Sequence, residues 1–150
     1  MIVNGKPVSE RMLALLRGRP MAFVTTMRPD GRMSTNPTAL PFDGERIRIS
    51  TTTNRKKYRN LMADDRITIC VVQPDNLNKY VEIRGRATVE FDRDRAFIDS
   101  IARQYMDVER YPFDGPGDER VFITVIPERI SSPRMPVEEG SRYREPQPKA

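Results

Sequence analysis

The sequence of 150 residues contains no histidine, no tryptophan and a single cysteine. The lack of histidine excludes the Ser-His and Cys-His nucleophile systems, the commonest general base and most zinc sites, so we expect no metal site. Cys70 cannot form an internal disulfide, and its place in the apolar run ITICVV predicts a buried core thiol rather than a nucleophile. Any enzymatic chemistry must therefore come from something other than histidine or a reactive thiol.

Long apolar runs are also lacking. No charged N-terminal region precedes an apolar stretch, and no stretch approaches 18 apolar residues, so we expect neither a signal peptide nor a membrane span, and a cytoplasmic location. A chain of this length is most economically one domain with a packed core. Its 26 basic and 21 acidic residues give a net charge of +5 and a pI near 9.7, which favours an anionic partner.

Alternating apolar residues and turn signals predict a mainly β fold. We expect the first three strands to form an antiparallel meander, in which Pro37 and Pro41 place the second strand at an edge or give it bulges. We expect residues 66–73 to be a fully buried strand, and Gly85 to mark a bend. Six short, mostly antiparallel strands with small helices at the openings suit a closed or nearly closed barrel. The expected strands are residues 21–27, 32–42, 45–51, 66–73, 79–91 and 120–130.

Three short helices and a tail complete the expected organisation. The first helix starts at a Ser9 cap, the second has Asn54 or Thr53 as its N-cap, and the third is capped by Asp92. The residues from 131 onward are rich in proline and mixed charge with little to bury. We therefore expect a barrel domain at residues 1–130 and a Pro-rich, polar C-terminal tail at residues 131–150.

The segment NRKKYRN, residues 54–60, places four cations at the first turn of the second helix. Exposed N–H groups at a helix N-terminus carry about half a positive unit charge and favour anions, so this is the unfavourable end for cations. The preceding run STTT, residues 50–53, adds hydroxyl groups. Backbone amides, hydroxyls and cations together have the composition of a phosphate site, in which lysine and arginine neutralise the charge.

Charge runs are more often solvated surface than binding sites. The segment has no glycine-rich phosphate loop and no Walker pattern, so the residues alone leave a phosphate site and a solvated basic face both open. A nucleic-acid-binding barrel would need aromatic side chains between the cations of an exposed strand, and residues 79–91 offer only Tyr80 beside Arg84 and Arg86. We therefore expect a small-molecule partner and no nucleic acid.

Several motifs in a fixed order carry a resemblance to a known superfamily. The pattern x-R-x-K-x-R-N-L is met within residues 54–61, DDR follows at 64–66, and IRGRA lies at 83–87. With the strands around them, they resemble the split β-barrel flavin/deazaflavin oxidoreductases, the superfamily named for pyridoxamine 5'-phosphate oxidase, and most of all its small F420-dependent branch. The resemblance runs from about residue 9 to residue 129. It implies a six-stranded antiparallel split β-barrel of the FMN-binding-like kind.

The resemblance also implies a set of cofactor-binding residues. In such proteins the strand-to-helix turn holds the cofactor phosphate, and the second strand runs beside the pyrimidine edge of the flavin-like ring, largely through backbone groups. The fold is a homodimer with both cofactor sites at the subunit interface, so two of the residues would reach a site from the partner chain. The implied residues are Asn36, Pro37 and Thr38 beside the ring; Ser50, Thr51, Thr52, Arg55 and Lys57 at the phosphate; Lys56 near an anionic tail; and Lys79 and Tyr80 from the partner.

The implied activity is hydride transfer from reduced coenzyme F420, a deazaflavin, to an electron-poor organic acceptor. The surplus of basic residues favours F420, whose phosphate and oligoglutamate tail carry several negative charges. FMN is the alternative cofactor, because the phosphate motif is shared across the superfamily, and a non-catalytic F420- or flavin-binding protein is the alternative to an enzyme. Tyr58, Tyr80 and Tyr105 have hydroxyls suited to proton donation, but buried tyrosines are more often structural. No catalytic residue is therefore assigned.

Overall fold

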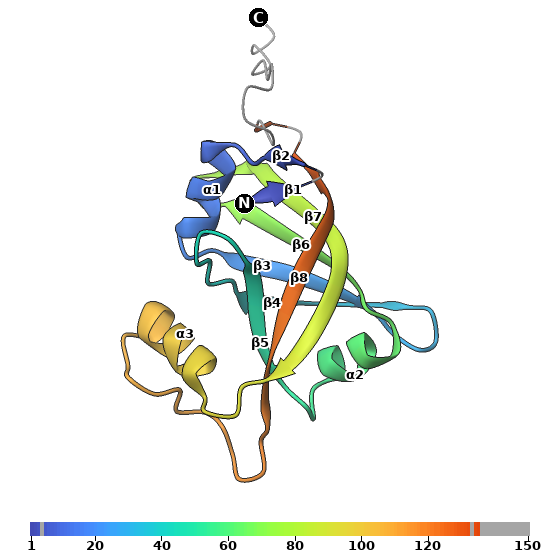
Figure 1. The fold of residues 1–150 in the computed structure, drawn as a ribbon, viewed down its shortest axis with the longest axis vertical. Coiled ribbons are helices and arrows are strands. Elements are labelled where there is room, and N and C mark those ends of the chain that lie inside the picture. Colours follow the sequence, from blue (N-terminus) through green and yellow to red (C-terminus); the bar gives the residue numbers. More distant parts are fainter. Residues whose placement is uncertain (4, 133, 136–150) are drawn as a thin grey trace, which may run out of the picture.

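The structure, a computed structural model, describes residues 1–3, 5–132, 134 and 135. Its main sheet has six antiparallel strands in the order β4-β3-β6-β7-β8-β5 and curls into a half-barrel (Figure 1). The predicted mainly β fold with six barrel strands is confirmed, as a split β-barrel. The strands are β3 (Met21–Met27), β4 (Met33–Ala39), β5 (Ile47–Thr52), β6 (Arg66–Gln73), β7 (Asn76–Phe91) and β8 (Arg120–Ser131).

Three helices lie at the two ends of the half-barrel: α1 (Glu10–Arg17) at one end, and α2 (Lys56–Ala63) and α3 (Ala96–Met106) at the other (Figure 1). The predicted cap of α1 is confirmed, since Ser9 Oγ accepts a hydrogen bond of 3.3 Å from the N–H of Met12. The buried face of α1 closes its end of the core. A short pair of strands, β1 (Ile2–Val3) and β2 (Lys6–Pro7), was not predicted.

The edge position predicted for β4 is confirmed, because β4 pairs only with β3 in the described sheet. The N–H of Arg28 donates to the carbonyl of Arg32, and the N–H of Leu40 donates to that of Pro20. Even-numbered residues of β4 therefore bond to β3, and odd-numbered residues direct their backbone groups away from it. Pro37 is one of the latter, so its missing N–H removes nothing from the ladder.

The predicted meander is wrong beyond its first hairpin. β5 pairs with β8, so β4 and β5 are the two opposite edges of the sheet. Among the described residues, a single isolated bridge joins Phe42, in the loop after β4, to Ile47, the first residue of β5. Pro37 leaves the open side of β4 without a donor in its middle, whereas β8 offers β5 an unbroken row of backbone groups. This separation produces the split in the barrel.

Strand β6 is not fully buried, contrary to the prediction. Ile67, Ile69 and Val71 face the core, while the alternate residues face outward and are half-buried at Cys70 and Val72. The helices cover the ends of the half-barrel and leave the outer face of β6 without a second layer. Cys70 is therefore a half-buried thiol rather than a core one, and burial, followed by the charge of Glu82, raises its pKa.

Gly85 marks the predicted irregularity in β7. The pairing of β7 with β8 changes register between Arg84 and Gly85. A Cβ atom added at Gly85 would collide with the carbonyl oxygen of Ile126 on β8. The glycine therefore permits a close approach of two backbones that no other residue allows.

The barrel takes in the first residues of the predicted tail. Ser131 ends β8, opposite Glu82, and Met135 is 4% exposed and packs in the core. The rest of the predicted tail, residues 136–150, lies outside the described residues. None of the helices in the described part of the chain has the length and apolar content needed to cross a membrane.

Candidate functional site: a basic cleft at the split of the barrel

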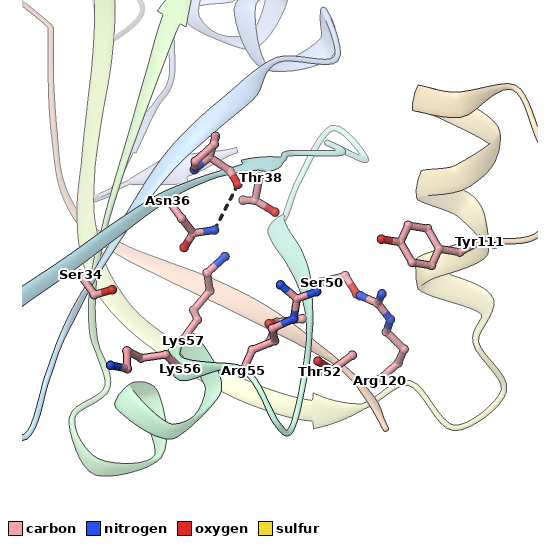
Figure 2. A pocket seen from close by; sticks show the side chains of 12 residues that line it. Ser34, Asn36, Thr38, Ser50, Thr52, Arg55, Lys56, Lys57, Tyr111 and Arg120 are labelled. Atoms are coloured by element: carbon pink, nitrogen blue, oxygen red, sulfur yellow. Dashed lines mark hydrogen bonds between the residues drawn. The ribbon is translucent and has the colours of Figure 1, made fainter. Parts of the chain in front are cut away.

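A cleft of about 440 Å³ lies at the split, between the edge strands β4 and β5 and the start of α2 (Figure 2). Binding pockets for small molecules commonly measure roughly 300 to 1,000 Å³, so the cleft can hold a small ligand or a large part of a cofactor. Nine of the eleven residues implied as cofactor-binding line it, and they come from β4, from the end of β5, and from the N-cap and first turn of α2. These are Asn36, Pro37, Thr38, Ser50, Thr51, Thr52, Arg55, Lys56 and Lys57.

Helix α2 begins beside the cleft without a side-chain cap. Its N-cap residue is Arg55, so the prediction of Asn54 or Thr53 as the cap is wrong. Asn54 is engaged elsewhere, because its amide oxygen accepts from the Thr52 hydroxyl and its amide nitrogen donates to Asp118 over 2.8 Å. No described side chain thus satisfies the first N–H groups of α2. Such a helix start is suited to bind an anion.

Lys57 is a buried cation in this cleft. It is only 8% exposed, and its ammonium group points toward Asn36 (Figure 2). No hydrogen bond or ion pair joins its ammonium to another of the described residues. Burial, and then the nearby charge of Arg55, lowers the pKa of Lys57 to about 8. A buried charge without a partner is unfavourable, so an anion in the cleft would supply the missing counter-charge.

The hydroxyl groups contribute less than the sequence suggests. Ser50 Oγ donates to the carbonyl of Val121 at 3.4 Å, and Thr52 Oγ1 donates to Asn54. Because a hydroxyl has one proton to donate, each could donate to a phosphate oxygen only by giving up that bond. The amides at the start of α2 and the cations, by contrast, can donate to an anion without giving up such a bond. Of these cations, Lys56 points away from Lys57 (Figure 2).

Three residues that line the cleft were missed by sequence reasoning: Ser34, Tyr111 and Arg120. Ser34 lies two residues before Asn36 on the same face of β4, so the alternation of the strand could have indicated it. Arg120 lies opposite Thr52 in the pairing of β5 with β8, and Tyr111 stands in the loop after α3. No local pattern connects these two residues with the motif at residues 54–60.

Two implied site residues and one tyrosine candidate lie elsewhere. Lys79 and Tyr80 are on β7 and do not line this cleft, so their role in a site completed by a partner chain stays a prediction. The hydroxyl of Tyr105 donates to the carbonyl of Pro20 at 3.0 Å, and burial raises the pKa of Tyr105 to about 12. Tyr105 is therefore a structural residue.

A half-barrel with a basic cleft at its split is the architecture of the split β-barrel proteins that bind flavins and deazaflavins. The chain belongs to the pyridoxamine 5'-phosphate oxidase family, whose pattern residues 8–132 match. A solved F420 reductase is 33% identical, with a TM-score of 0.69, over 79% of this chain and 94% of that one. No match was found among curated proteins.

More distant solved structures share the fold alone. A pyridoxamine 5'-phosphate oxidase-related, FMN-binding protein from Nostoc punctiforme is 13% identical, with a TM-score of 0.58, over 81% of each chain. General stress protein 26 from Bacillus anthracis is 17% identical, with a TM-score of 0.62, over 82% of this chain and 91% of that one. The chain thus has the fold of flavin-binding oxidoreductases, a fold class that includes FMN-binding and F420-linked proteins.

The residues of the cleft fit the phosphate of such a cofactor. The start of α2 lacks a side-chain cap, and the ammonium of Lys57 is buried without a partner among the described residues. Arg55 adds a second cation to the same wall. A phosphate group would accept hydrogen bonds from the amides and neutralise the buried charge.

Proposed function

We propose that the protein is an F420-dependent oxidoreductase that reduces an electron-poor organic acceptor. The observation that carries this proposal is the buried, unpartnered ammonium of Lys57 beside the uncapped start of α2. It makes the cleft a place for an anionic group of the cofactor. The similarity to an F420 reductase at 33% identity supports the deazaflavin as that cofactor.

The charge of the cleft also supports F420 over FMN. Arg55, Lys56 and Lys57 lie within three consecutive positions of the cleft wall. FMN carries one phosphate, whereas F420 carries further negative charges along its tail, so a wall with several cations gains more from F420. FMN remains the second candidate, because a phosphate-binding site can accept the phosphate group of either cofactor.

The chemistry needs little from the side chains beyond binding. When bound, the reduced deazaflavin supplies a hydride to a carbon of the acceptor, and a proton from solvent completes the reduction. Lys57, Arg55 and the amides of α2 would hold the phosphate of the cofactor, and the open backbone groups of the odd-numbered residues of the edge strand β4 would be available to its ring. Because the cofactor supplies the hydride and the protein binds the cofactor, the proposed reaction requires no histidine.

Turnover is the direct test of this proposal. The protein is mixed with reduced F420 and a panel of enones, quinones and tetrapyrroles, and oxidation of the cofactor is followed by absorbance. We expect oxidation above the uncatalysed rate with at least one acceptor. Binding of F420 without oxidation by any member of the panel would favour a non-catalytic carrier instead.

We also propose a homodimer that completes the site. Phe23 on β3 is 47% exposed, and it lies opposite the cleft residue Pro37 on one side and Cys70 on the other. Met21, 51% exposed, continues this outer face, and Tyr80 on β7 lies opposite the half-buried Val72. These exposed apolar side chains run up to the cleft, with the charged Glu82 beside Cys70 on the same face, and they support an interface that would bring residues of a second copy to the cofactor.

A charge on this surface tests the dimer. We expect a dimer in analytical ultracentrifugation at micromolar concentration, and we expect Phe23→Asp to shift it toward monomer and to weaken cofactor binding. Ile2→Asp is the matched control, because Ile2 is 71% exposed on β1, outside this surface. A monomeric wild-type protein that binds cofactor normally would contradict the shared site.

A further inference from the structure

Arg120 forms a buried ion pair at the wall of the cleft. Its Nε–H donates to both carboxylate oxygens of Asp114, at 3.0 and 2.9 Å, and the side chains of both residues are only 9% exposed. Burial lowers the pKa of Arg120, but the bonds to Asp114 outweigh it and leave that pKa raised. Burial likewise raises the pKa of the Asp114 carboxyl, and the bonds from Arg120 and Arg95 bring it below its ordinary value. Both groups are therefore charged at neutral pH.

A second arginine holds the same carboxylate. Arg95 donates to Asp114 at 2.7 Å and to the backbone carbonyl of Tyr111 at 3.4 Å. The backbone of Arg95 is left-handed, with φ of 62°, a conformation that is unfavourable for a non-glycine residue. The N–H of Tyr111 donates to Asp99, which also lies 3.8 Å from Arg95. The loop after α3 is thus fixed by ionic contacts at several points.

This cluster has no net charge, since it contains two arginines and two aspartates. It therefore does not attract an anion in the way that the lysines of α2 do. What the cluster does is hold two side chains in fixed positions at the cleft, the guanidinium of Arg120 and the ring of Tyr111. Preorganised groups lose little freedom when a ligand binds, so they contribute efficiently to affinity.

Tyr111 and Arg120 line the cleft on the α3 side, across from Lys57 and Asn36 (Figure 2). The guanidinium carbon of Arg120 lies 4.5 Å from the centre of the Tyr111 ring, and Arg120 Nη1 donates to Ser50 Oγ at 3.3 Å. The Tyr111 hydroxyl points into the cleft (Figure 2). A guanidinium can only donate hydrogen bonds, and a phenol donates readily, so this wall suits acceptor atoms.

We propose that Tyr111 and Arg120 form a second ligand-binding wall, which binds carbonyl or carboxylate oxygens of the part of the ligand that lies beyond the phosphate. Asp114 and Arg95 are positioning residues that hold this wall in place. The proposal rests on the proposed function, because it concerns the same cleft and the same ligand. It adds the α3 side of the cleft, which touches the residues implied at the phosphate through the bond from Arg120 to Ser50.

Tyr111→Phe is the sharpest test, because it removes only the hydroxyl and keeps the ring under Arg120. The matched control is Tyr105→Phe, which removes a hydroxyl bonded to Pro20 outside the cleft. Each variant is titrated with F420 and FMN, and with inorganic phosphate as a competitor. The comparison uses whichever of the two cofactors binds the wild-type protein more tightly. We expect Tyr111→Phe to lower the affinity for that cofactor by about 3- to 10-fold, the effect of one lost hydrogen bond. We expect the affinity of Tyr111→Phe for inorganic phosphate, measured by competition, to change by less than about twofold. Tyr105→Phe should change neither the cofactor affinity nor the phosphate affinity.

Arg120→Lys and Asp114→Asn test the wall itself and its support. Lysine keeps the charge but loses the planar fork, so we expect cofactor binding to weaken by about 10-fold with phosphate competition unchanged. Asp114→Asn should also lower the cofactor affinity and leave the phosphate affinity unchanged, because Asp114 positions Arg120.

A general loosening of the fold would lower the affinity for phosphate as well as for the cofactor, and that result would overturn the proposal. Wild-type cofactor affinity in both Tyr111→Phe and Arg120→Lys would also overturn it, and would leave the proposed function intact. Failure of wild type to bind either cofactor would instead refute the proposed function.

Discussion

Replacing Lys57 should make the ligand-free protein more stable and its ligand binding weaker. The folded pKa of about 8 lies below the ordinary value of 10.5, so the protonated lysine is disfavoured by folding. This destabilisation is complete below pH 8, fades as the pH rises from about 8 to 10.5, and is absent above that range. The fall in pKa from 10.5 to about 8 destabilises the folded protein by at most about 3 kcal/mol, since a pKa change of one unit is worth about 1.4 kcal/mol.

Lys57→Met keeps the apolar stem and removes the charge. We expect its free energy of unfolding at pH 7 to rise by about 1 to 3 kcal/mol without ligand, or its Tm by roughly 3 to 10 °C for a domain of this size. Cofactor binding should weaken by about 10- to 100-fold, the effect of a lost charge-assisted hydrogen bond. Thermal unfolding and fluorescence titration of the same preparations measure the two effects.

The pH dependence of wild-type binding provides an internal check. An anion that needs the protonated lysine should bind about tenfold more weakly at pH 9 than at pH 7, because the lysine titrates near pH 8. The phosphate of FMN loses its second proton near pH 6, so the ligand itself does not titrate in this window. Lys57→Arg, which keeps its charge, should bind with a flat profile from pH 7 to 9. A Lys57→Met protein that is no more stable than wild type and binds as tightly would refute the reasoning.

Two further predictions concern the fold that positions the cleft. Gly85→Ala should destabilise the protein by about 1 to 3 kcal/mol or more, because the added methyl group would collide with the carbonyl of Ile126; a thermal melt close to that of wild type would count against the close approach of β7 and β8. Asp92→Ala should lower stability by about 1 to 2 kcal/mol, because the carboxylate of Asp92 accepts hydrogen bonds from the N–H groups of Phe97 and Ile98 at the start of α3; urea unfolding with an unchanged midpoint would contradict this capping role.

Local patterns in the sequence predicted most of the elements that build the cleft. The alternation of apolar residues located the strands, and the cap at Ser9 located α1. The hydroxyl run and the cations at residues 50–57 placed the β5–α2 turn, which lies within eight consecutive residues. Short-range signals of this kind are readable from one sequence because the side chains involved are neighbours in the chain.

The partners of the strands were not readable in the same way. The local sequence pattern of β5 does not indicate whether it pairs with β8 or with β4, because either pairing would bury Ile47 and Ile49. The outcome depends on which backbone edge offers an unbroken row of donors. The outward side of β4, where Pro37 has no N–H, does not offer one. The split in the barrel follows from that long-range choice.

Sequence reasoning missed the second ligand-binding wall, formed by Tyr111 and Arg120, for a related reason. Tyr111 and Arg120 come from the loop after α3 and from β8, and their place at the cleft depends on the ionic cluster around Asp114. The N-cap of α2 was assigned wrongly because Asn54 has a competing partner in Asp118, 64 residues along the chain. Side chains suited to a local role can be drawn into distant contacts, and the sequence does not reveal which contact prevails.

A side-by-side titration of the purified wild-type protein with F420 and FMN tests the central claim most directly. Both ligands are followed by fluorescence at pH 7 and at one salt concentration, because screening by salt weakens the attraction of a basic cleft for an anion. We predict saturable binding of both, with F420 the tighter ligand because it brings more negative charge to the cations beside Lys57. Tighter binding of FMN would contradict the assignment of F420, and the absence of binding by either would contradict the assignment of the cleft as a cofactor site.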